Sequence, residues 1–438
     1  MLGPVTEQGE RPAAGVERPD LYDVAFGESL HGKSVLHVGS SLGSFCVEAL
    51  ARGAAEAVGL DVDPDRIAAA TEAAEIKGLK PAYQQGDIEA FEPAQQFDIV
   101  VCINVLHHVF DPIAVLHKLG KMTREKLVLE VATPAEHDAA AFGFPRRFRW
   151  AHSRLPSMYV GPGAPLTRRR TMSQKFFLSE QAIERILSSH MKMFYKVEIA
   201  PSPLKGRFIV TATRRRIDQL LVVSGPTSSG KTTFLKQLRT GELPNDVRAT
   251  LPESSSRWPQ VGANRLFRSP LLSNDGRPLD EPYLDGLALH YDILRPRTTG
   301  THNHDRDQSL DLLDCARDVT IVVLRPDTDQ LIKQLVKNEL DSQRERTSTR
   351  TGPRRNALTS LAAAVPRMVR RWLARVAPLR RFYATVQGGQ DRSEAEELLA
   401  YYERDGWLDD WYDRWSGYLA ERHPAAAVVD VTLPIAGD

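Results

Sequence analysis

The strongest constraint on this chain is a pattern that occurs twice: an apolar run leads directly into a glycine-rich loop, and a helical pattern follows. The first run, Ser34–Val38, precedes the loop 39–43, and the second, Leu220–Ser224, precedes the loop 225–230. Small residues let the backbone approach a ligand closely, and the start of a helix offers N–H groups that no helix carbonyl takes. Two such elements predict two tandem α/β domains, each with a ligand site at the end of its first strand.

Short apolar runs alternate with helical patterns in the first half, which predicts a parallel sheet covered by helices on both faces. The expected strands are residues 34–38, 57–61, 97–103 and 126–131, and the expected helices are 44–52, 64–77 and 112–119. Residues 133–172 are rich in Arg and Pro and are expected to be irregular. A helix over 179–189, opened by a serine cap, and a hairpin of strands 195–199 and 207–213 then complete the first domain.

The alternation restarts at residue 220, after the connector Arg214–Gln219. So short a connector predicts domains that are held close together. The expected strands of the second half are 220–224, 287–292, 320–325 and 426–431, and a helix is expected over 233–238. The fold class is therefore two tandem, doubly wound α/β domains. Their expected bounds are a flexible segment 1–29, a first domain 30–215, and a second domain 216–438 with an Arg-rich helical lid or insertion over 340–420.

Composition excludes several classes of protein. The 438 residues carry 57 Lys+Arg and 56 Asp+Glu, so the net charge of +1 argues against a surface that binds polyanions everywhere. Cys46, Cys102 and Cys315 are too far apart for a zinc knuckle or a disulfide framework. No apolar stretch approaches the roughly 18 residues of a membrane span, and the N-terminus lacks the pattern of a signal peptide. We therefore expect a cytoplasmic protein without stable membrane insertion.

Acidic residues follow the next two strands of the first half. Asp61 comes about 20 residues after the first loop and ends the second strand, where a carboxylate can accept the hydroxyls of a ribose. Asp87 and Ile88 follow the third strand position, where an acid and an apolar side chain can hold an adenine. The first loop therefore has the surroundings of an adenosine site.

Residues 34–132 resemble a class I methyltransferase that uses S-adenosylmethionine (SAM). The resemblance rests on VLHVGSSLGSF, VGLDVDPDRI, GDIEAF and FDIVVCINVLHHV, which occur in the family's order, and the closing VEIAPSPLKGRFIVTATR is similar to its terminal hairpin. It implies a Rossmann-like fold, SAM as methyl donor, and an Asn104 that faces the methyl group. The implied SAM contacts are Gly39, Ser40, Ser41 and Gly43 at the methionine end, Asp61 at the ribose, and Asp87 with Ile88 at the adenine.

The chain departs from the family pattern at two positions. His37 stands where the family usually has an acid, and Ser41 stands where it usually has a glycine. The acid commonly contacts the amino group of the methionine moiety, so its loss is expected to weaken SAM binding. The alternative is a scaffold that keeps the fold without the chemistry.

Two further features of the first half allow more than one interpretation. His107, beside His108, is a candidate general base for an acceptor hydroxyl, and a capping or core histidine is the alternative. The basic region 145–170 is either an acceptor-binding lid or a solvated surface loop.

The second loop satisfies the pattern G-x-x-x-x-G-K-[ST] between a strand and a helix. The pattern predicts that loop N–H groups wrap the phosphates of ATP, that Lys231 reaches the β- and γ-oxygens, and that Thr232 binds Mg²⁺. Asp292, at the end of an apolar run, is the expected acid of the metal site, with Asp314 and Asp318 as weaker candidates. The expected nucleotide contacts are Gly225, Ser228, Ser229, Gly230, Lys231, Thr232 and Thr233.

The second half resembles a P-loop kinase, which implies phosphoryl transfer or hydrolysis without naming the acceptor. Between Arg344 and Arg381 the chain has eleven arginines and one acid, Glu345. This run is a kinase lid, an amphipathic surface for an anionic membrane or nucleic acid, or a solvated helix. The aromatic residues of 398–415, including Trp411 and Trp415, are either a sugar-stacking row or a packed core.

Together these features predict a bifunctional transferase that combines methyl transfer from SAM with phosphoryl transfer from ATP. A shared large acceptor, such as a glycan, is favoured by the fusion of the two domains. The alternatives are an ATP-dependent protein that modifies or repairs RNA, and a switch in which nucleotide state gates a degenerate methyltransferase.

Overall fold

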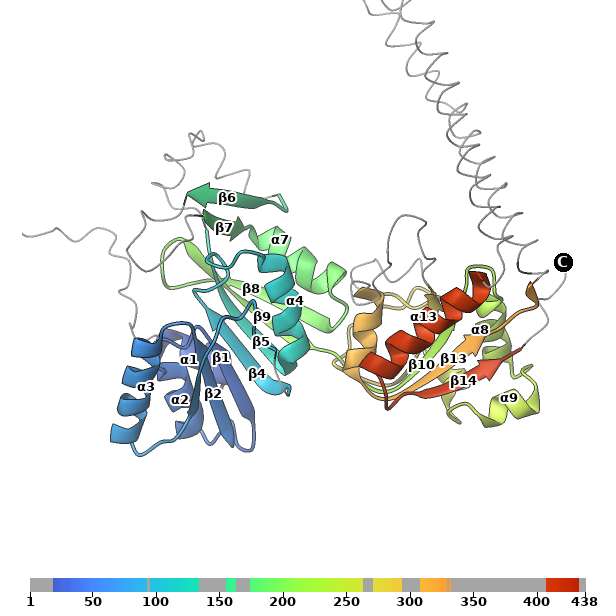
Figure 1. Cartoon of the computed structure of the whole chain (residues 1–438), viewed down its shortest axis with the longest axis horizontal. Helices are drawn as coiled ribbons and strands as arrows, with labels where there is room; N and C mark the ends of the chain where they lie inside the picture. Colours follow the sequence, from blue (N-terminus) through green and yellow to red (C-terminus); the bar gives the residue numbers. More distant parts are fainter. Residues whose placement is uncertain are drawn as a thin grey trace, which may run out of the picture. The chain divides into compact units, whose positions relative to one another are not determined.

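The structure is a computed structural model and describes residues 19–92, 95–133, 155–162, 174–262, 271–293, 308–328, 331 and 407–432. The chain divides into two compact units (Figure 1). Of the described residues, the first unit contains those up to Gln219 together with 271–287 and 308–317. The remaining described residues form the second unit.

A seven-stranded sheet in the order β3-β2-β1-β4-β5-β9-β8 forms the centre of the first unit. The strands are β1 (Ser34–Val38), β2 (Glu56–Asp61), β3 (Ala82–Gln85), β4 (Phe97–Ile103), β5 (Thr123–Ala132), β8 (Phe194–Pro201) and β9 (Arg207–Arg214). The first five run parallel, and β9 is antiparallel to both β5 and β8. The predicted parallel sheet and the closing antiparallel hairpin are confirmed.

Three of the helices described in the first unit begin where a side chain takes a free N–H group of the first turn. They are α1 (Pro19–Phe26), α2 (Ser44–Ala51), α3 (Pro64–Ile76), α4 (Pro112–Met122), and α7 (Glu180–Arg185), which continues as the π-helix η1 (Ile186–His190). The carboxylates of Asp63 and Asp111 accept from the first turns of α3 and α4, and each helix has proline as its first residue. Ser179 accepts from Ala182 at the start of α7, as predicted.

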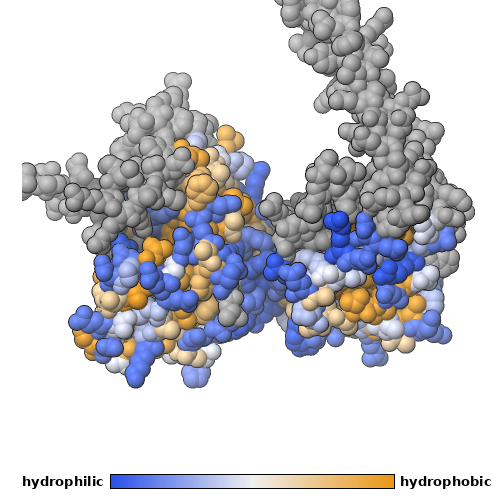
Figure 2. Space-filling view, in the orientation of Figure 1, coloured by the Kyte–Doolittle hydropathy of each residue, from blue (hydrophilic) through white to orange (hydrophobic). Residues whose placement is uncertain are grey.

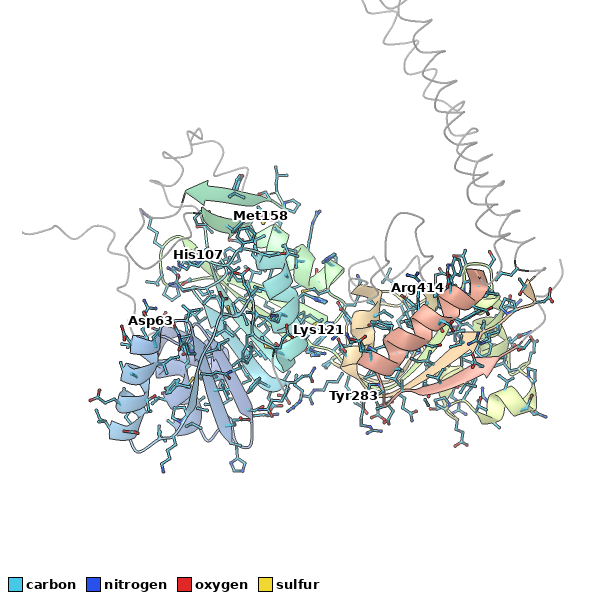
Figure 3. All side chains as sticks on the ribbon, in the orientation of Figure 1. Asp63, His107, Lys121, Met158, Tyr283 and Arg414 are labelled. Carbon is cyan, nitrogen blue, oxygen red and sulfur yellow. The ribbon has the colours of Figure 1, made fainter. Side chains whose placement is uncertain are left out.

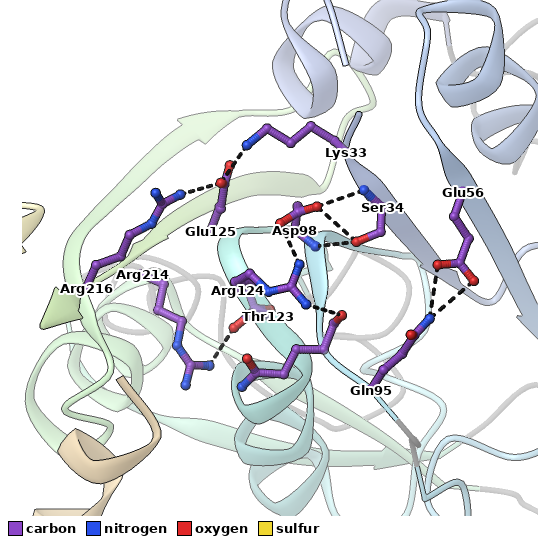
Figure 4. Close-up of polar contacts among 11 residues, drawn as sticks. Lys33, Ser34, Glu56, Gln95, Asp98, Thr123, Arg124, Glu125, Arg214 and Arg216 are labelled. Atoms are coloured by element: carbon purple, nitrogen blue, oxygen red, sulfur yellow. Dashed lines mark hydrogen bonds and ion pairs between the residues drawn. The ribbon is translucent and has the colours of Figure 1, made fainter. Parts of the chain in front are cut away.

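A polar cluster joins the starts of three strands of this sheet (Figure 4). The carboxylate of Asp98 accepts hydrogen bonds from the backbone N–H and the hydroxyl of Ser34, and it pairs with Arg124 at 2.9 Å. Burial alone would raise the pKa of Asp98, but these hydrogen bonds and the guanidinium lower it. The ionised carboxylate therefore ties β1, β4 and β5 together at the edge opposite the ligand loop.

Two elements of the first unit were not expected from the sequence. Helix α1 lies within the segment predicted to be flexible, and its residues Leu21, Ala25 and Phe26 are buried in the core beside Phe45. The region predicted to be irregular contains β6 (Met158–Pro162), which pairs antiparallel with β7 (Gln174–Leu178). Apolar surface lies at these strands in Figure 2, and Met158 and Val160 of β6 contribute exposed side chains to it.

A segment from the second half of the sequence belongs to the first unit. It is the 3-10 helix η5 (Gln308–Cys315), whose Asp311 is 4% exposed. The carboxylate of Asp311 lies 3.0 Å from Nε2 of His117 and accepts from the backbone N–H of Lys192 at 3.3 Å. Arg214 donates to the carbonyls of Gly120 and Asp314, so the end of α4, the end of β9 and η5 meet around one buried guanidinium.

The second sheet has five strands in the order β11-β12-β10-β13-β14. They are β10 (Arg216–Gly225), β11 (Gln260–Val261), β12 (Tyr283–Asp292), β13 (Ala316–Leu324) and β14 (Ala427–Val431). The accompanying helices are α8 (Lys231–Thr240), α9 (Asn245–Ala249), the 3-10 turn η2 (Ser255–Arg257) and α13 (Trp407–Arg422). Leu221 and Val223 of β10 pack with Phe234 and Leu238 of α8, so the predicted strand, loop and helix are present.

The division of the second half into an α/β unit agrees with the predicted alternation. The domain boundary predicted near residue 216 stays a prediction. Within the described residues, no helix has both the length and the apolar character needed to cross a membrane.

Candidate functional site

The loop between β1 and α2 is held by close packing. Gly39 and Gly43 have φ angles of 74° and 75°, in the region that favours glycine. A Cβ atom on Gly39 would collide with the side chain of Val105, and one on Gly43 would collide with the ring of Tyr83. The loop therefore lies against the residues that follow β4 and against β3, which leaves no room for a larger residue at either glycine.

Asp61 connects this loop to the end of β2. Its carboxylate is 5% exposed and accepts the backbone N–H of Ser41 at 2.8 Å and that of Asp63 at 3.0 Å. Asp61 also accepts, through its backbone carbonyl, the N–H of Gly86 at 2.9 Å. The structure thus brings together the three predicted parts of the adenosine site, namely the loop, the end of β2 and the residues after β3.

The two residues predicted at the adenine differ in exposure. Asp87 is exposed, and its carboxylate accepts the N–H of Glu89 at 2.9 Å, whereas Ile88 is buried. An exposed acid beside a buried apolar side chain is consistent with the predicted adenine contact.

Asn104 directly follows β4 and has a φ angle of 62°, which is uncommon for a residue with a side chain. Its side chain is exposed, and its N–H donates to the carbonyl of Glu130 at 3.4 Å. Val38 at the end of β1 is paired with Cys102 of β4, so Asn104 and the glycine loop lie at the same edge of the sheet. A strained, exposed polar residue at a ligand edge is typical of a functional position.

His107 is buried and packs on the hairpin of β6 and β7 (Figure 3). Its ring stacks on that of Phe177 with centroids 6.4 Å apart, and its carbonyl accepts the N–H of Phe176 at 3.3 Å. This packing is that of a core histidine, which was the alternative to a general base. The catalytic role of His107 stays a prediction.

His37 occupies β1 immediately before the loop and is 4% exposed. Burial lowers its pKa to about 3, so the imidazole is neutral near neutral pH. Among the residues that the structure describes, neither ring nitrogen has a hydrogen-bond partner, and the same holds for the hydroxyls of Ser40 and Ser41. The sequence identified His37 as a departure from the family pattern but carried no signal for its lack of partners.

Tyr83 and Val105 are parts of this site that the sequence did not identify. Tyr83 donates its hydroxyl hydrogen to the carbonyl of Gly43 at 3.3 Å, and burial raises its pKa. Tyr83 lies outside the quoted motifs, and Val105 lies in one of them without any feature that marks it as a contact of the loop.

The second predicted site lies in the second unit, at the loop between β10 and α8. Lys231, the first residue of α8, is almost fully buried, and its Nζ lies 2.7 Å from Oδ1 of Asp292 at the end of β12. Nζ also donates to the carbonyl of Gly225 at 3.0 Å and to the hydroxyl of Ser229 at 3.2 Å. The predicted lysine and the predicted acid therefore meet directly across the loop.

The charge state of Asp292 follows from its neighbours. Burial alone would raise its pKa, but the hydrogen bond with His290 and the charge of Lys231 hold it well below its ordinary value. Nε2 of His290, which the sequence did not identify, lies 3.5 Å from Oδ1 of Asp292. Asp314 instead lies in η5, where its carboxylate is 3.9 Å from Nζ of Lys121.

The remaining residues predicted at this loop lie in the loop itself or on the first turn of α8. Ser228 and Gly230 have φ angles of 69° and 90°, and Thr232 and Thr233 are exposed on the first turn of α8. Among the described residues, no group of three or more His, Cys, Asp or Glu side chains could hold a metal ion.

Two tryptophans of α13 distinguish between the sugar-stacking row and the packed core that the sequence allowed. Trp411 and Trp415 are fully buried, and Nε1 of Trp415 donates to the hydroxyl of Ser224 at 3.1 Å. These two belong to a packed core and not to a sugar-stacking surface. Leu398, Tyr401, Tyr402, the run from Arg344 to Arg381 and most of region 145–170 lie outside the described residues.

Comparisons with known proteins concern the first unit. Residues 29–161 match the protein family described as "Methyltransferase domain". The ubiquinone biosynthesis O-methyltransferase of Methylococcus capsulatus is 39% identical over 98 residues, which is 22% of this chain and 41% of that protein. The protein of the same name from Actinobacillus pleuropneumoniae is 34% identical over 110 residues, 24% of this chain and 47% of that protein. The chain thus spans less than half the length of these relatives.

Solved structures with a similar chain course include magnesium protoporphyrin IX methyltransferase from Synechocystis, at 18% identity and a TM-score of 0.30, covering 42% of this chain and 75% of that chain. A SAM-dependent methyltransferase from Mesorhizobium loti has 17% identity and a TM-score of 0.32, covering 44% of this chain and 96% of that chain. The family match over 29–161 covers the loop, Asp61, Asp87 and Asn104 described above. The N-terminal half of the chain is a class I SAM-dependent methyltransferase domain.

Proposed function

We propose that the first unit transfers a methyl group from SAM to a nucleophile of an acceptor. The observation that supports this most is the convergence of the glycine loop, Asp61, Asp87 and Asn104 at the carboxyl edge of one parallel sheet. Ligands of open α/β sheets bind at this edge, where the helix starts point.

The residues present fit SAM. The two glycines let the loop pack tightly against Val105 and Tyr83. Among the described residues, the ring nitrogens of His37 and the hydroxyl of Ser40 have no hydrogen-bond partner, and a polar ligand would supply one. Bound SAM supplies a methyl group on a sulfonium, which a nucleophile can take by direct displacement. The contribution of the chain is to bind the donor, to hold the acceptor in line with that carbon, and to exclude water.

Asn104 is the residue that we place next to the reacting atoms. Its exposed amide, fixed by strained backbone, is suited to orient an acceptor through a hydrogen bond. The names of the curated relatives specify O-methylation, so hydroxyl compounds are the acceptors that we would test first.

Calorimetric titration of the whole protein with SAM tests this proposal. We expect saturable binding that Asp61→Ala abolishes, because the variant loses both the ribose carboxylate and the anchor of the loop. Glu72→Ala, an exposed change on α3, is the matched control and should bind as wild type. Absence of SAM binding by the wild-type protein would leave only a scaffold.

We further propose that the second unit binds ATP with Mg²⁺ and transfers its terminal phosphoryl group. The direct contact of Lys231 with Asp292 at the end of the adjacent strand supports this assignment. When ATP binds, Nζ of Lys231 would move from the carboxylate of Asp292 to the phosphates. Asp292 and the hydroxyl of Thr232 would then hold Mg²⁺. Two protein ligands suffice, because Mg²⁺ at such sites takes its other ligands from phosphates and water.

Binding of a fluorescent ATP analogue tests this second proposal. We expect Lys231→Ala to lose binding and Lys236→Ala, which alters an exposed lysine of the same helix, to retain it. Formation of ADP together with a phosphorylated acceptor would indicate a kinase, and release of inorganic phosphate would indicate hydrolysis. A nucleotide-dependent change in methyl transfer without phosphorylated product would indicate a switch.

We infer that one large acceptor receives both groups, with a glycan favoured and RNA as the second candidate. Product analysis with both donors present tests the inference. Methyl and phosphoryl groups on unrelated molecules would contradict it, and RNA binding that falls steeply with salt would favour RNA.

A further inference from the structure

Strand β6 and the residues just before it present aliphatic side chains to solvent. Met158 and Val160 are 46% and 52% exposed, and Leu155 is 58% exposed. Residues two apart on a strand lie on the same face, so Met158 and Val160 belong to one patch (Figure 2). The outer face of a hairpin is normally polar, so three exposed aliphatic residues within six positions indicate a surface that meets an apolar partner.

The hairpin of β6 and β7 is attached to the first unit by its other face. Tyr159, between the two exposed residues of β6, is half-buried and is paired with Phe177 of β7. Phe177 is buried and stacks on the ring of His107, with centroids 6.4 Å apart. Leu155 is also held in place, because its carbonyl accepts the hydroxyl of Ser179 at 2.7 Å. The exposed aliphatic side chains therefore stand on backbone that hydrogen bonds and packing fix.

The stretch of sequence that contains this hairpin is strongly basic. From Ala139 to Ser179 it has seven arginines, one lysine and no Asp or Glu, in a chain whose net charge is +1. Arg154 directly precedes Leu155, and Arg168–Arg170 come shortly before β7. Positive charge on both sides of an exposed apolar strand is complementary to a partner that is anionic at its surface and apolar beneath it.

We propose that Leu155, Met158 and Val160 dock the first unit on an anionic lipid surface, where the basic charge of the same stretch is attracted by the headgroups. Aliphatic side chains gain free energy when they leave water for the acyl chains, and this contribution needs no charge. A nucleic acid is also attracted by arginines, but its bases stack on aromatic rings, whereas the exposed side chains here are aliphatic. The contact is peripheral, since no helix in the described part of the chain could cross a membrane.

Cosedimentation of the full chain with lipid vesicles tests this proposal. The vesicles consist of phosphatidylcholine alone or of an equal mixture of phosphatidylcholine and phosphatidylglycerol. A double variant with Met158→Gln and Val160→Thr removes apolar surface while keeping side-chain size, and Leu155→Gln does so without altering β6 itself. Val428→Thr, which changes a valine that is 51% exposed on β14 of the second unit, is the matched control. Vesicle binding needs neither SAM nor ATP, so the result does not depend on the proposed function.

We expect the wild-type protein to bind the mixed vesicles at least tenfold more tightly than phosphatidylcholine alone, because only the mixture has net negative charge. The double variant should lose at least tenfold in affinity for the mixed vesicles, Leu155→Gln should weaken binding in the same direction, and the control should bind as wild type. If the double variant does not fold, as judged by circular dichroism, Leu155→Gln decides alone.

Three results would overturn the proposal. The first is a wild-type protein that does not bind the mixed vesicles. The second is binding that the variants leave unchanged, or that the control weakens equally, because the aliphatic patch would then have no part in it. The third is binding of single-stranded polyuridylate in place of vesicles, which would assign the basic stretch to a nucleic acid.

Discussion

The buried imidazole of His37 makes the stability of the first unit depend on pH. Its pKa is lowered by burial from an ordinary 6.5 to about 3. Between pH 6.5 and pH 3 the unfolded chain binds a proton at His37 and the folded chain does not. The free energy of unfolding is therefore highest above pH 6.5 and falls as the pH falls toward 3. We expect the free energy of unfolding to drop by on the order of 3 kcal/mol between pH 7 and pH 4 from this residue.

Urea unfolding at a series of pH values measures this effect. His37→Phe should flatten the dependence, whereas His31→Phe, at an exposed position, should leave it unchanged. A wild-type pH dependence that persists in His37→Phe would assign it to other groups.

Two glycines have similar backbone conformations and different surroundings. Substitutions at them therefore distinguish the effect of backbone strain from the effect of a steric collision at the ligand loop. Gly39 and Gly78 have φ angles of 74° and 69°, but only at Gly39 would a Cβ meet a neighbour, the side chain of Val105. We expect Gly39→Ala to lower SAM affinity more than tenfold. Gly78→Ala should cost about 1 kcal/mol of stability and leave affinity unchanged, as checked by calorimetry and urea unfolding.

At this scale the sequence located the residues that belong to short motifs. The loop glycines, Asp61, Lys231 and Asp292 lie where their spacing predicted, because each is tied to the end of a strand. The sequence did not identify Tyr83, Val105 and His290 as site residues, since their contacts depend on which strands become neighbours. The lack of partners at His37 could not be predicted, because hydrogen bonding in a core depends on all the side chains around it.

At the scale of elements, α1 was not predicted because this short amphipathic segment lies in a polar stretch of the sequence. Phe26 is buried against Phe45 of α2, at a centroid distance of 5.9 Å, whereas Val24 of the same helix is exposed. We expect Phe26→Ala to lower the free energy of unfolding by about 3–5 kcal/mol and Val24→Ala to change it little. Thermal and urea unfolding would show the difference, and equal small effects would mean that α1 does not belong to the core.

The main sheets were predictable because alternating runs of apolar residues have a strong period. The β6–β7 hairpin was not, since its strands are short and lie in an Arg- and Pro-rich stretch without a regular pattern. Strand β5 begins before its predicted bound because Thr123 pairs with Phe97 of β4 without being apolar.

At the scale of the whole molecule, residues 271–287 and 308–317 pack in the first unit although they follow the second ligand loop in sequence. Arg215 donates to the carbonyl of Leu279, and Asp311 accepts from Lys192. A chain that ends at residue 215 would deprive Arg215 of the carbonyl of Leu279 and Arg214 of the carbonyl of Asp314, while Arg214 keeps the carbonyl of Gly120. We expect it to be less stable by several kcal/mol, or insoluble, although it contains every strand of the first sheet.

Comparison of the truncated chain with the full-length variant Asp311→Asn tests this expectation. The variant should lose part of the stability by removing the charge opposite His117, and the truncated chain should lose more. A truncated chain as stable as the first unit of the full protein would show that the added segments are dispensable. The sequence could not predict this arrangement, because the connector at 214–219 suggested a boundary while the contacts that cross it join residues about 100 positions apart.

This interleaving restricts how such a protein can change over generations. When domains follow one another as separate segments, recombination at the linker can exchange one of them and leave the other intact. Here an exchange at the connector would remove η5 and with it Asp311 and the carbonyl of Asp314 from the first unit. Any replacement of the second half would therefore have to supply the same segment to the first unit.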